Sequence, residues 1–150
     1  MTDLWYPHLT VATIIENDGK FLMVKEISDG RIVINQPAGH LDKDETLLEA
    51  AVRETLEETG WHVSIIDLVG FYMHTSPHNK TTYFRALFVG AALSHDTERT
   101  LDEGILEAPW LTIEQIKEHP EILRSPMVLQ CIEDYLCGKR LPLDSISHLI

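Results

Sequence analysis

The sequence predicts an α/β protein in which a β-sheet is sandwiched between helices. Two observations predict this class: strand-like segments fall into two groups separated by an amphipathic helix, and a further helix follows the second group. The chain has 150 residues, 44% of them hydrophobic, which is enough for one globular domain with a sizeable core. Because no internal repeat, low-complexity tract or long linker divides it, we expect residues 1–150 to form a single domain.

Runs of β-branched and aromatic residues predict the strands. They cover residues 8–16, 20–26, 63–74, 82–92 and, as a shorter strand, 107–111. Between the first two, the sequence Asn17-Asp18-Gly19 is typical of a tight hairpin turn, because these residue types tolerate positive φ. The first two strands are therefore expected to pair as a hairpin.

The helices are predicted from apolar periodicity and from residues that begin and end helices. They cover residues 46–59, 112–118 and 126–137. Asp44 or Thr46 can cap the first helix, and Thr46 with Glu49 fits a capping box. Gly60 can adopt the left-handed conformation that ends it.

The first helix has a carboxylate face. At about 100° per residue, Glu57 and Glu58 lie roughly 60° and 40° either side of Glu54. Ala50 and Ala51 are expected near these carboxylates, where small side chains would let a ligand approach. The opposite face carries a stripe suited to packing on a sheet, formed by Leu48, Val52, Thr55, Leu56 and Thr59.

Concentrated like charges indicate a cation site on this face. Each pair of carboxylates at these spacings repels by roughly 0.2–0.5 kcal/mol. A cation bound between them would turn this repulsion into a net attraction. Arg53 lies four residues from both Glu49 and Glu57, so it can pair with either. The alternative is a solvated acidic face, which explains most charge runs in soluble proteins.

A longer segment, residues 39–61, makes the cation site more specific. It fits the pattern G-x5-E-x7-R-E-U-x-E-E-x-G-U, where U is apolar, and therefore resembles the Nudix hydrolases. The fixed positions are Gly39, Glu45, Arg53, Glu54, Glu57, Glu58 and Gly60. At about one chance in twenty per position, these seven match by accident at roughly 10⁻⁹ per starting site. Two apolar positions depart from the pattern, as Thr55 and Trp61.

This resemblance implies an α/β/α sandwich with a mixed sheet, the Nudix fold, and hydrolysis of a phosphoanhydride with Mg²⁺. Such chemistry requires neutralised phosphate oxygens and an aligned water, and carboxylates are suitable hard ligands for Mg²⁺ or Mn²⁺. The implied metal ligands are Glu54, Glu58, Glu57 as ligand or helper, and the backbone carbonyl of Gly39 or a neighbour. Glu45 and Arg53 would brace the loop and orient the ligands.

The resemblance leaves the general base open. Members of the family take it from the signature segment, where Glu54 is the candidate, or from a later loop. In that loop the candidates are Glu103 and Glu107, seven and three residues before Trp110. Either of these two can instead be a solvated loop carboxylate.

Arg85 is a candidate substrate contact because it lies in an otherwise apolar strand. Alternation places it on one side of the sheet with Tyr83, Leu87 and Val89. A cation there requires a partner, which is either a buried glutamate or a substrate phosphate.

Other substrate contacts have equally ordinary alternatives. His74 and His78 flank a turn, where they either touch a substrate or cover a sheet edge. Trp5, Tyr6 and Tyr72 can stack on an aromatic ring, but aromatic side chains are more often part of a core.

Charge and hydropathy restrict the partners. A formal net charge of −12 argues against duplex nucleic acid, whose phosphates require a basic surface. With no apolar run of about 20 residues and no basic, apolar leader, we expect a soluble cytoplasmic protein without a membrane partner. Cys131 and Cys137 fit no metal-binding spacing and point to different helix faces.

Outside the signature segment, the chain resembles a bacterial group of phosphatases within the family. The matching runs are NQPAGHL (35–41), DETL (44–47), LRSP (123–126) and GKRLPL (138–143). This resemblance implies a Mg²⁺-dependent monomer that releases orthophosphate from nucleoside tri- and diphosphates and from hydroxymethylpyrimidine pyrophosphate, a thiamine precursor. A dimer stays open, as do two alternatives: a Nudix enzyme for dinucleoside polyphosphates, ADP-ribose or oxidised nucleotides, and a non-catalytic Nudix binding module.

Overall fold

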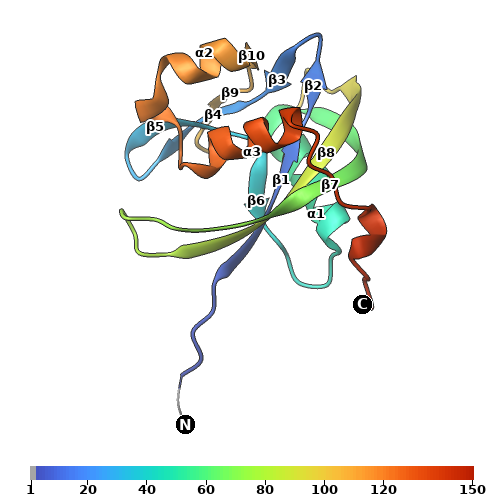
Figure 1. Ribbon diagram of the computed structural model, residues 1–150. Helices are drawn as coiled ribbons and strands as arrows, with labels where there is room; N and C mark the ends of the chain where they lie inside the picture. Colours follow the sequence, from blue (N-terminus) through green and yellow to red (C-terminus); the bar gives the residue numbers. More distant parts are fainter. Residues whose placement is uncertain (1–2) are drawn as a thin grey trace.

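The computed structural model describes residues 3–150 and is built around a twisted four-stranded sheet (Figure 1). Its strands, in spatial order, are β6 (Ala38–His40), β1 (His8–Ile14), β8 (Thr82–His95) and β7 (Trp61–Thr75). β1 and β8 run parallel, whereas β6 and β7 pair antiparallel to their neighbours. The sheet is therefore mixed, as expected.

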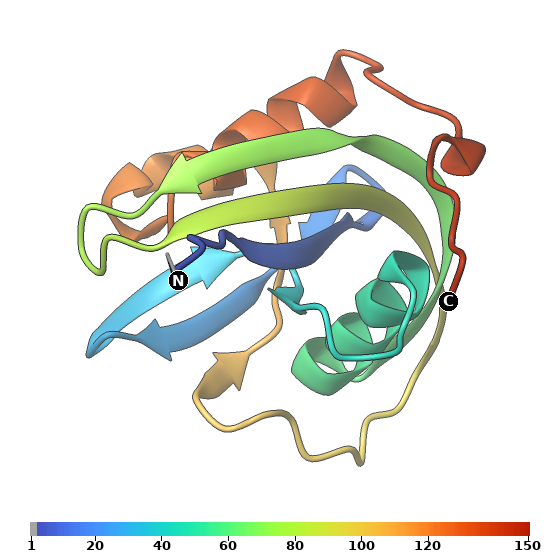
Figure 2. The same ribbon diagram turned by 90° about the horizontal axis from the view of Figure 1, so that it is seen from below.

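Helices cover both faces of this sheet. α1 (Leu47–Thr59) lies against one face and α3 (Met127–Leu136) against the other (Figure 2). Along β8, Ala86 and Phe88 pack in the cluster that contains α1 residues, and Leu87 packs with Val128 and Ile132 of α3. This alternation confirms the predicted α/β/α sandwich and places Arg85 on the α3 side. The remaining helical segments are α2 (Ile113–Glu118), η1 (Pro120–Ile122) and η2 (Leu143–Ser145).

Two small sheets flank the main one. Their orders are β10-β3-β2 and β5-β4-β9, and the strands are β2 (Glu16–Asn17), β3 (Lys20–Leu22), β4 (Val24–Ser28), β5 (Arg31–Asn35), β9 (Ile105–Glu107) and β10 (Trp110–Thr112). The predicted turn is confirmed, since Asp18 and Gly19 have φ of 51° and 75° between β2 and β3. Asp29 and Gly30 form a turn of the same kind before β5. Neither β5 nor β6 is among the predicted strands.

The predicted ends of α1 are confirmed. Thr46, rather than Asp44, is the cap: its hydroxyl accepts a hydrogen bond from the Glu49 amide at 3.1 Å, and the Glu49 carboxylate accepts one from the Thr46 amide at 3.3 Å. Gly60 ends the helix with φ of 78° and leads directly into β7. Both ends of the carboxylate helix are thus fixed by local chemistry.

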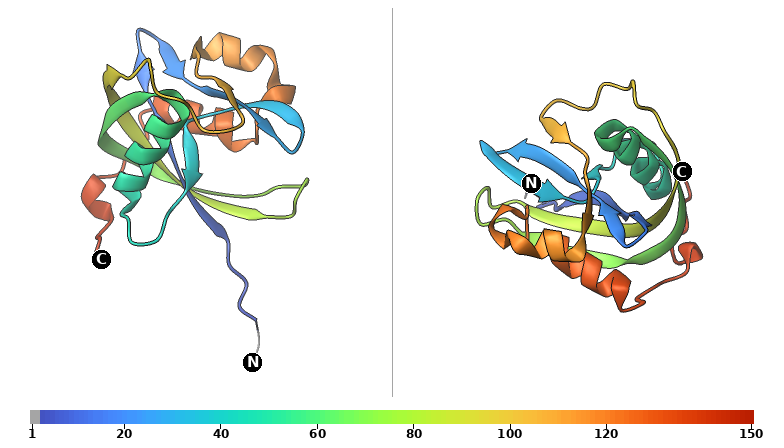
Figure 3. Two further views of the ribbon diagram at one scale, coloured as in Figure 1. Left: turned by 180° about the vertical axis from the view of Figure 1, so that it is seen from behind. Right: turned by 90° about the horizontal axis from the view of Figure 1, so that it is seen from above.

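The expected position of Ala50 and Ala51 is wrong. Both are buried in the core between α1 and the sheet, close to Leu68 and Phe88, and neither lines the cavity described below. Their small side chains instead allow the helix to approach the sheet closely. Seen from behind, α1 lies directly over the sheet (Figure 3).

The same orientation of α1 buries two polar residues of the signature. Thr55 is fully buried and its hydroxyl donates to the Ala51 carbonyl at 2.8 Å, so this departure from the family pattern is accommodated in the core. Glu58, only 8% exposed, also lies on the buried side. Within residues 3–150, no helix is long and apolar enough to cross a membrane.

Candidate metal centre and substrate cavity

Three carboxylates gather at the side of α1. Glu54 and Glu57 come from the helix and Asp102 from the loop between β8 and β9, which passes beside α1 (Figure 2). One oxygen of each lies within 4.8 Å of the other two. The Asp102 amide donates to the Glu57 carbonyl at 3.0 Å, which holds the loop against the helix. Such a set of hard oxygen donors suits Mg²⁺ or Mn²⁺.

The later loop contributes a different acid from those predicted. Asp102 joins the carboxylate cluster, whereas the adjacent Glu103 is exposed and lies outside it. Glu107, on β9, forms an ion pair with Lys25 at 3.8 Å. Sequence position alone could not distinguish Asp102 from Glu103, because the direction of each side chain depends on how the loop docks on α1.

Glu58 lies beside this cluster and next to β6. Its carboxylate accepts a hydrogen bond from the Ala38 amide at 2.9 Å. Burial, together with the nearby charges of Glu26, Glu54 and Asp102, raises the pKa of Glu58 to about 9. Burial also raises the pKa of Glu54 to about 6. A cation in contact with these groups would favour their charged forms.

Gly39 allows β6 to lie directly against the helix. A Cβ atom at this position would overlap the carboxylate of Glu54. The residue must therefore be glycine for the Glu54 side chain to occupy its place. This contact brings the backbone of Gly39 to the carboxylates, where its carbonyl is a predicted metal ligand.

Arg53 ties the signature carboxylates together. It donates to Glu45 through Nε at 3.0 Å and Nη2 at 2.7 Å, and through Nη1 to Glu54 at 2.8 Å and Glu57 at 3.2 Å. Nη2 also donates to the His40 carbonyl at 3.0 Å. One guanidinium thus fixes two carboxylates of the cluster and the strand next to them.

These contacts decide between the predicted partners of Arg53. Its pairing with Glu57 is confirmed, whereas Glu49 is engaged in the capping box instead. Glu45, the bracing residue predicted by resemblance, also accepts a hydrogen bond from the Asp42 amide at 2.7 Å. Its hydrogen bonds with Arg53 hold the pKa of Glu45 below its usual range.

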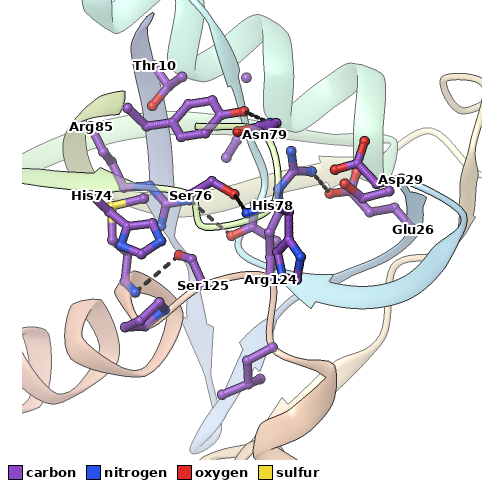
Figure 4. A pocket seen from close by; sticks show the side chains of 18 of the residues that line it. Thr10, Glu26, Asp29, His74, Ser76, His78, Asn79, Arg85, Arg124 and Ser125 are labelled. Atoms are coloured by element: carbon purple, nitrogen blue, oxygen red, sulfur yellow. Dashed lines mark hydrogen bonds and ion pairs between the residues drawn. The ribbon is translucent and has the colours of Figure 1, made fainter. Parts of the chain in front are cut away.

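A cavity of about 830 Å³ opens beside the carboxylates. It lies between the β4–β5 hairpin, the end of the β7–β8 hairpin and the segment that leads into α3 (Figure 4). Glu54, Glu58 and Gly39 line it, and so do three arginines and three histidines: Arg31, Arg85, Arg124, His40, His74 and His78. Two carboxylates of α1 and three arginines therefore face one space.

Arg85 lines this cavity while being only 4% exposed. It donates to the side-chain oxygens of Gln36 at 2.9 Å and Asn35 at 3.0 Å. The expected structural alternative, a buried glutamate partner, is not what the described residues show. Both partners are neutral amides. They lie far from Arg85 in the sequence, so the residues around Arg85 could not predict them.

Of the other predicted substrate contacts, two line the cavity and three do not. His74 and His78 line the cavity and are labelled at its wall in Figure 4. Tyr72 packs at the edge of the core and donates to Asp134 at 2.7 Å. Trp5 and Tyr6 are exposed in the N-terminal arm and belong neither to the core nor to the cavity lining.

The raised pKa of Glu58 predicts a pH dependence for the metal-free protein. Between the ordinary carboxyl value of about 4.3 and about 9, the folded chain binds more protons at Glu58 than the unfolded chain does. Its stability should therefore fall as pH rises, by up to about 1.4 kcal/mol per pH unit from this group. Denaturation in EDTA at pH 5.5 and 8.5 should show a smaller fall for Glu58→Gln; equal falls would contradict this account.

Comparison with known proteins agrees with this geometry. A family model described as NUDIX domain matches residues 6–129. The chain is 38% identical over 144 residues to Phosphatase NudJ of Escherichia coli K12, covering 96% of this chain and 93% of that protein. A NUDIX hydrolase structure from Nitrosomonas europaea has a TM-score of 0.93 and 46% identity, covering 95% of this chain and 97% of that one.

A second NUDIX hydrolase structure from Nitrosomonas europaea is more distant, with a TM-score of 0.73 and 27% identity over 91% of this chain and 74% of that one. The family model extends from β1 into α3 and includes the carboxylate helix with every fixed position of the signature. The protein belongs to the Nudix hydrolase family.

Proposed function

We propose that this Nudix hydrolase uses Mg²⁺ to cleave phosphoanhydride bonds in nucleoside di- and triphosphates and in hydroxymethylpyrimidine pyrophosphate, releasing orthophosphate. The observation that carries this proposal is the cavity that joins Glu54 and Glu58 to one buried arginine, Arg85, and to the exposed Arg31 and Arg124. A substrate that fills it can place phosphate against both. The similarity over 96% of the chain to a relative named as a phosphatase supports orthophosphate as the product.

The carboxylates of α1 are proposed to hold the metal. Glu54, Glu57 and Glu58 would be its ligands, with the carbonyl of Gly39, and Asp102 lies where it can join them. When bound, a divalent cation neutralises phosphate oxygens and lowers the pKa of a coordinated water. Arg53 and Glu45 keep these ligands in place through the hydrogen bonds described above.

The attacking water requires a proton acceptor. Glu54 is positioned for this role because it belongs to the carboxylate cluster and also faces the cavity. From the later loop, the geometry favours Asp102 over the predicted Glu103, because only Asp102 joins the cluster. Glu103 would act only after the loop rearranged.

Substrate contacts come from the other walls of the cavity. Arg85 and His74 line it and are proposed to bind the substrate. A guanidinium binds phosphate well, and an imidazole can donate a hydrogen bond to it. We also propose that the enzyme acts as a monomer and in the cytoplasm, where nucleoside phosphates are made.

The product distinguishes this proposal from other Nudix specificities. Incubation with Mg²⁺ and GDP or hydroxymethylpyrimidine pyrophosphate should release orthophosphate, and EDTA should stop the reaction. Dinucleoside polyphosphates, ADP-ribose and oxidised nucleotides serve as competing substrates in the same assay. Pyrophosphate as the sole primary product from nucleoside triphosphates would contradict the proposed activity.

Glu58→Gln tests whether the protein is a catalyst or a non-catalytic binding module. The change keeps an acceptor for the Ala38 amide but removes the charge needed to hold a cation. We expect kcat to fall at least 100-fold while the circular dichroism spectrum stays unchanged. Glu49→Gln is a matched control on the same helix, since glutamine preserves the capping box, and kcat should stay within twofold. An unchanged rate for Glu58→Gln would remove the helix from the mechanism.

A further inference from the structure

Arg85 is a buried cation whose described partners are all neutral. Besides the amide oxygens of Asn35 and Gln36, it donates to the sulfur of Cys131 at 3.7 Å. Its Nε has no hydrogen-bond partner within residues 3–150. The guanidinium therefore keeps its full positive charge in a largely desolvated place.

An arginine that serves only the fold is expected to have a carboxylate partner when it is buried. Removing a charge from water is costly, and the cost is largest when a buried charge has no partner of opposite sign. Of the two acids of α3, Asp134 is engaged elsewhere, since it accepts hydrogen bonds from Tyr72 at 2.7 Å and Gln130 at 2.9 Å. Glu133 lines the cavity but is not a hydrogen-bond partner of Arg85. Among the residues that the structure describes, no carboxylate pairs directly with Arg85, so an anion from outside the chain can take that place.

The two amides that contact Arg85 are fixed with their oxygens toward it. Gln36 donates through its side-chain nitrogen to the Val128 carbonyl at 2.7 Å, so its oxygen faces the guanidinium. The Asn35 oxygen accepts both from Arg85 and from the Gln36 amide at 2.9 Å. Asn35 and Gln36 are positioning residues that orient the cation without neutralising it.

Another cavity arginine shows the contrast. Arg124 donates to Glu26 at 2.7 Å, so its charge is already balanced by a carboxylate. Both arginines line the same cavity, and Figure 4 shows the Arg124–Glu26 pair on the wall formed by β4. Of these two arginines, Arg124 thus has a carboxylate partner, whereas the buried Arg85 is held only by neutral groups among the residues that the structure describes.

We propose that Arg85, oriented by Asn35 and Gln36, forms an anion subsite that binds a phosphate group without the metal. Because the subsite and the carboxylates face one cavity, a substrate with two or more phosphates can contact both. The identity of the natural ligand rests on the proposed function. The binding of phosphate itself does not.

Inorganic phosphate and the full-length, EDTA-treated protein provide the test. Asn35→Asp keeps both hydrogen bonds of the Asn35 oxygen and gives Arg85 a carboxylate partner. Calorimetry should show phosphate binding to the parent and at least tenfold weaker binding to Asn35→Asp. The matched control is Asn79→Asp, which adds the same charge to the cavity lining at a residue that bonds Tyr83 and is not a hydrogen-bond partner of Arg85, and its affinity should stay within threefold of the parent.

Thermal unfolding provides a second readout, because it reports whether the charge of Arg85 lacks a counter-charge in the folded protein. Asn35→Asp should unfold at the same temperature as the parent or above it, because the buried guanidinium gains a counter-charge. Arg85→Met, which removes the cation while filling its space with an apolar chain, is the second variant and should abolish phosphate binding. Failure of the metal-free parent to bind phosphate, or equal binding by the parent, Asn35→Asp and Arg85→Met, would overturn the proposal.

Glu58→Gln separates this proposal from the proposed function. It should lose turnover but bind phosphate as the parent does, because the anion subsite contains no metal ligand. If the parent hydrolyses none of the substrates and phosphate binding still follows Arg85 and Asn35, the proposed function fails and the subsite stands. If turnover depends on Glu58 but phosphate binding requires Mg²⁺, the subsite fails and the proposed function stands.

Discussion

The contact between β6 and α1 is the constraint on which the site depends. Gly39 lies so close to the helix that a single added carbon would overlap Glu54. The same contact brings the Ala38 amide to Glu58 and the His40 carbonyl to Arg53. Three adjacent residues of one short strand therefore set the positions of two carboxylates and the arginine that orders them.

On each side of the cavity, a buried ionisable group has no partner of opposite charge among the described residues. On the α1 side, Glu58 is buried with other carboxylates nearby, which raises its pKa to about 9. On the α3 side, Arg85 is buried with amides. Both arrangements cost stability in the isolated chain, and the proposed ligands of opposite charge, a cation in one case and a phosphate in the other, would relieve that cost. A chain with a net charge of −12 can bind an anionic substrate through such local features.

Much of the fold and the site followed from local sequence. The capping box at Thr46, the left-handed Gly60 and the Asp18-Gly19 turn are confirmed because each depends on residues within a few positions of one another. The seven fixed positions of the signature identify the family for the same reason. Roles within the signature stay predictions, since spacing specifies which residues are near a cation but not how each one coordinates it.

The wrong or missed features all depend on tertiary contacts. Ala50 and Ala51 face the sheet because small side chains there let α1 pack closely on it. A helical wheel gives the angles between residues but not which face of the helix packs on the sheet. Asp102 rather than Glu103 reaches the cluster because its backbone docks on Glu57. The partners of Arg85 come from β5 and the residue after it, about 50 positions earlier in the chain. β5 and β6 were missed because short strands carry little periodic signal.

The affinity of the protein for Mg²⁺ after Gly39→Ala is the most direct test of this account. The added methyl must displace the Glu54 carboxylate, while residue 39 stays on a strand that tolerates alanine. Calorimetric titration of the parent and the variant should show Mg²⁺ affinity reduced at least tenfold, with thermal unfolding still cooperative. Unchanged affinity in a folded Gly39→Ala protein would contradict the claim that close packing of β6 on α1 builds the metal site.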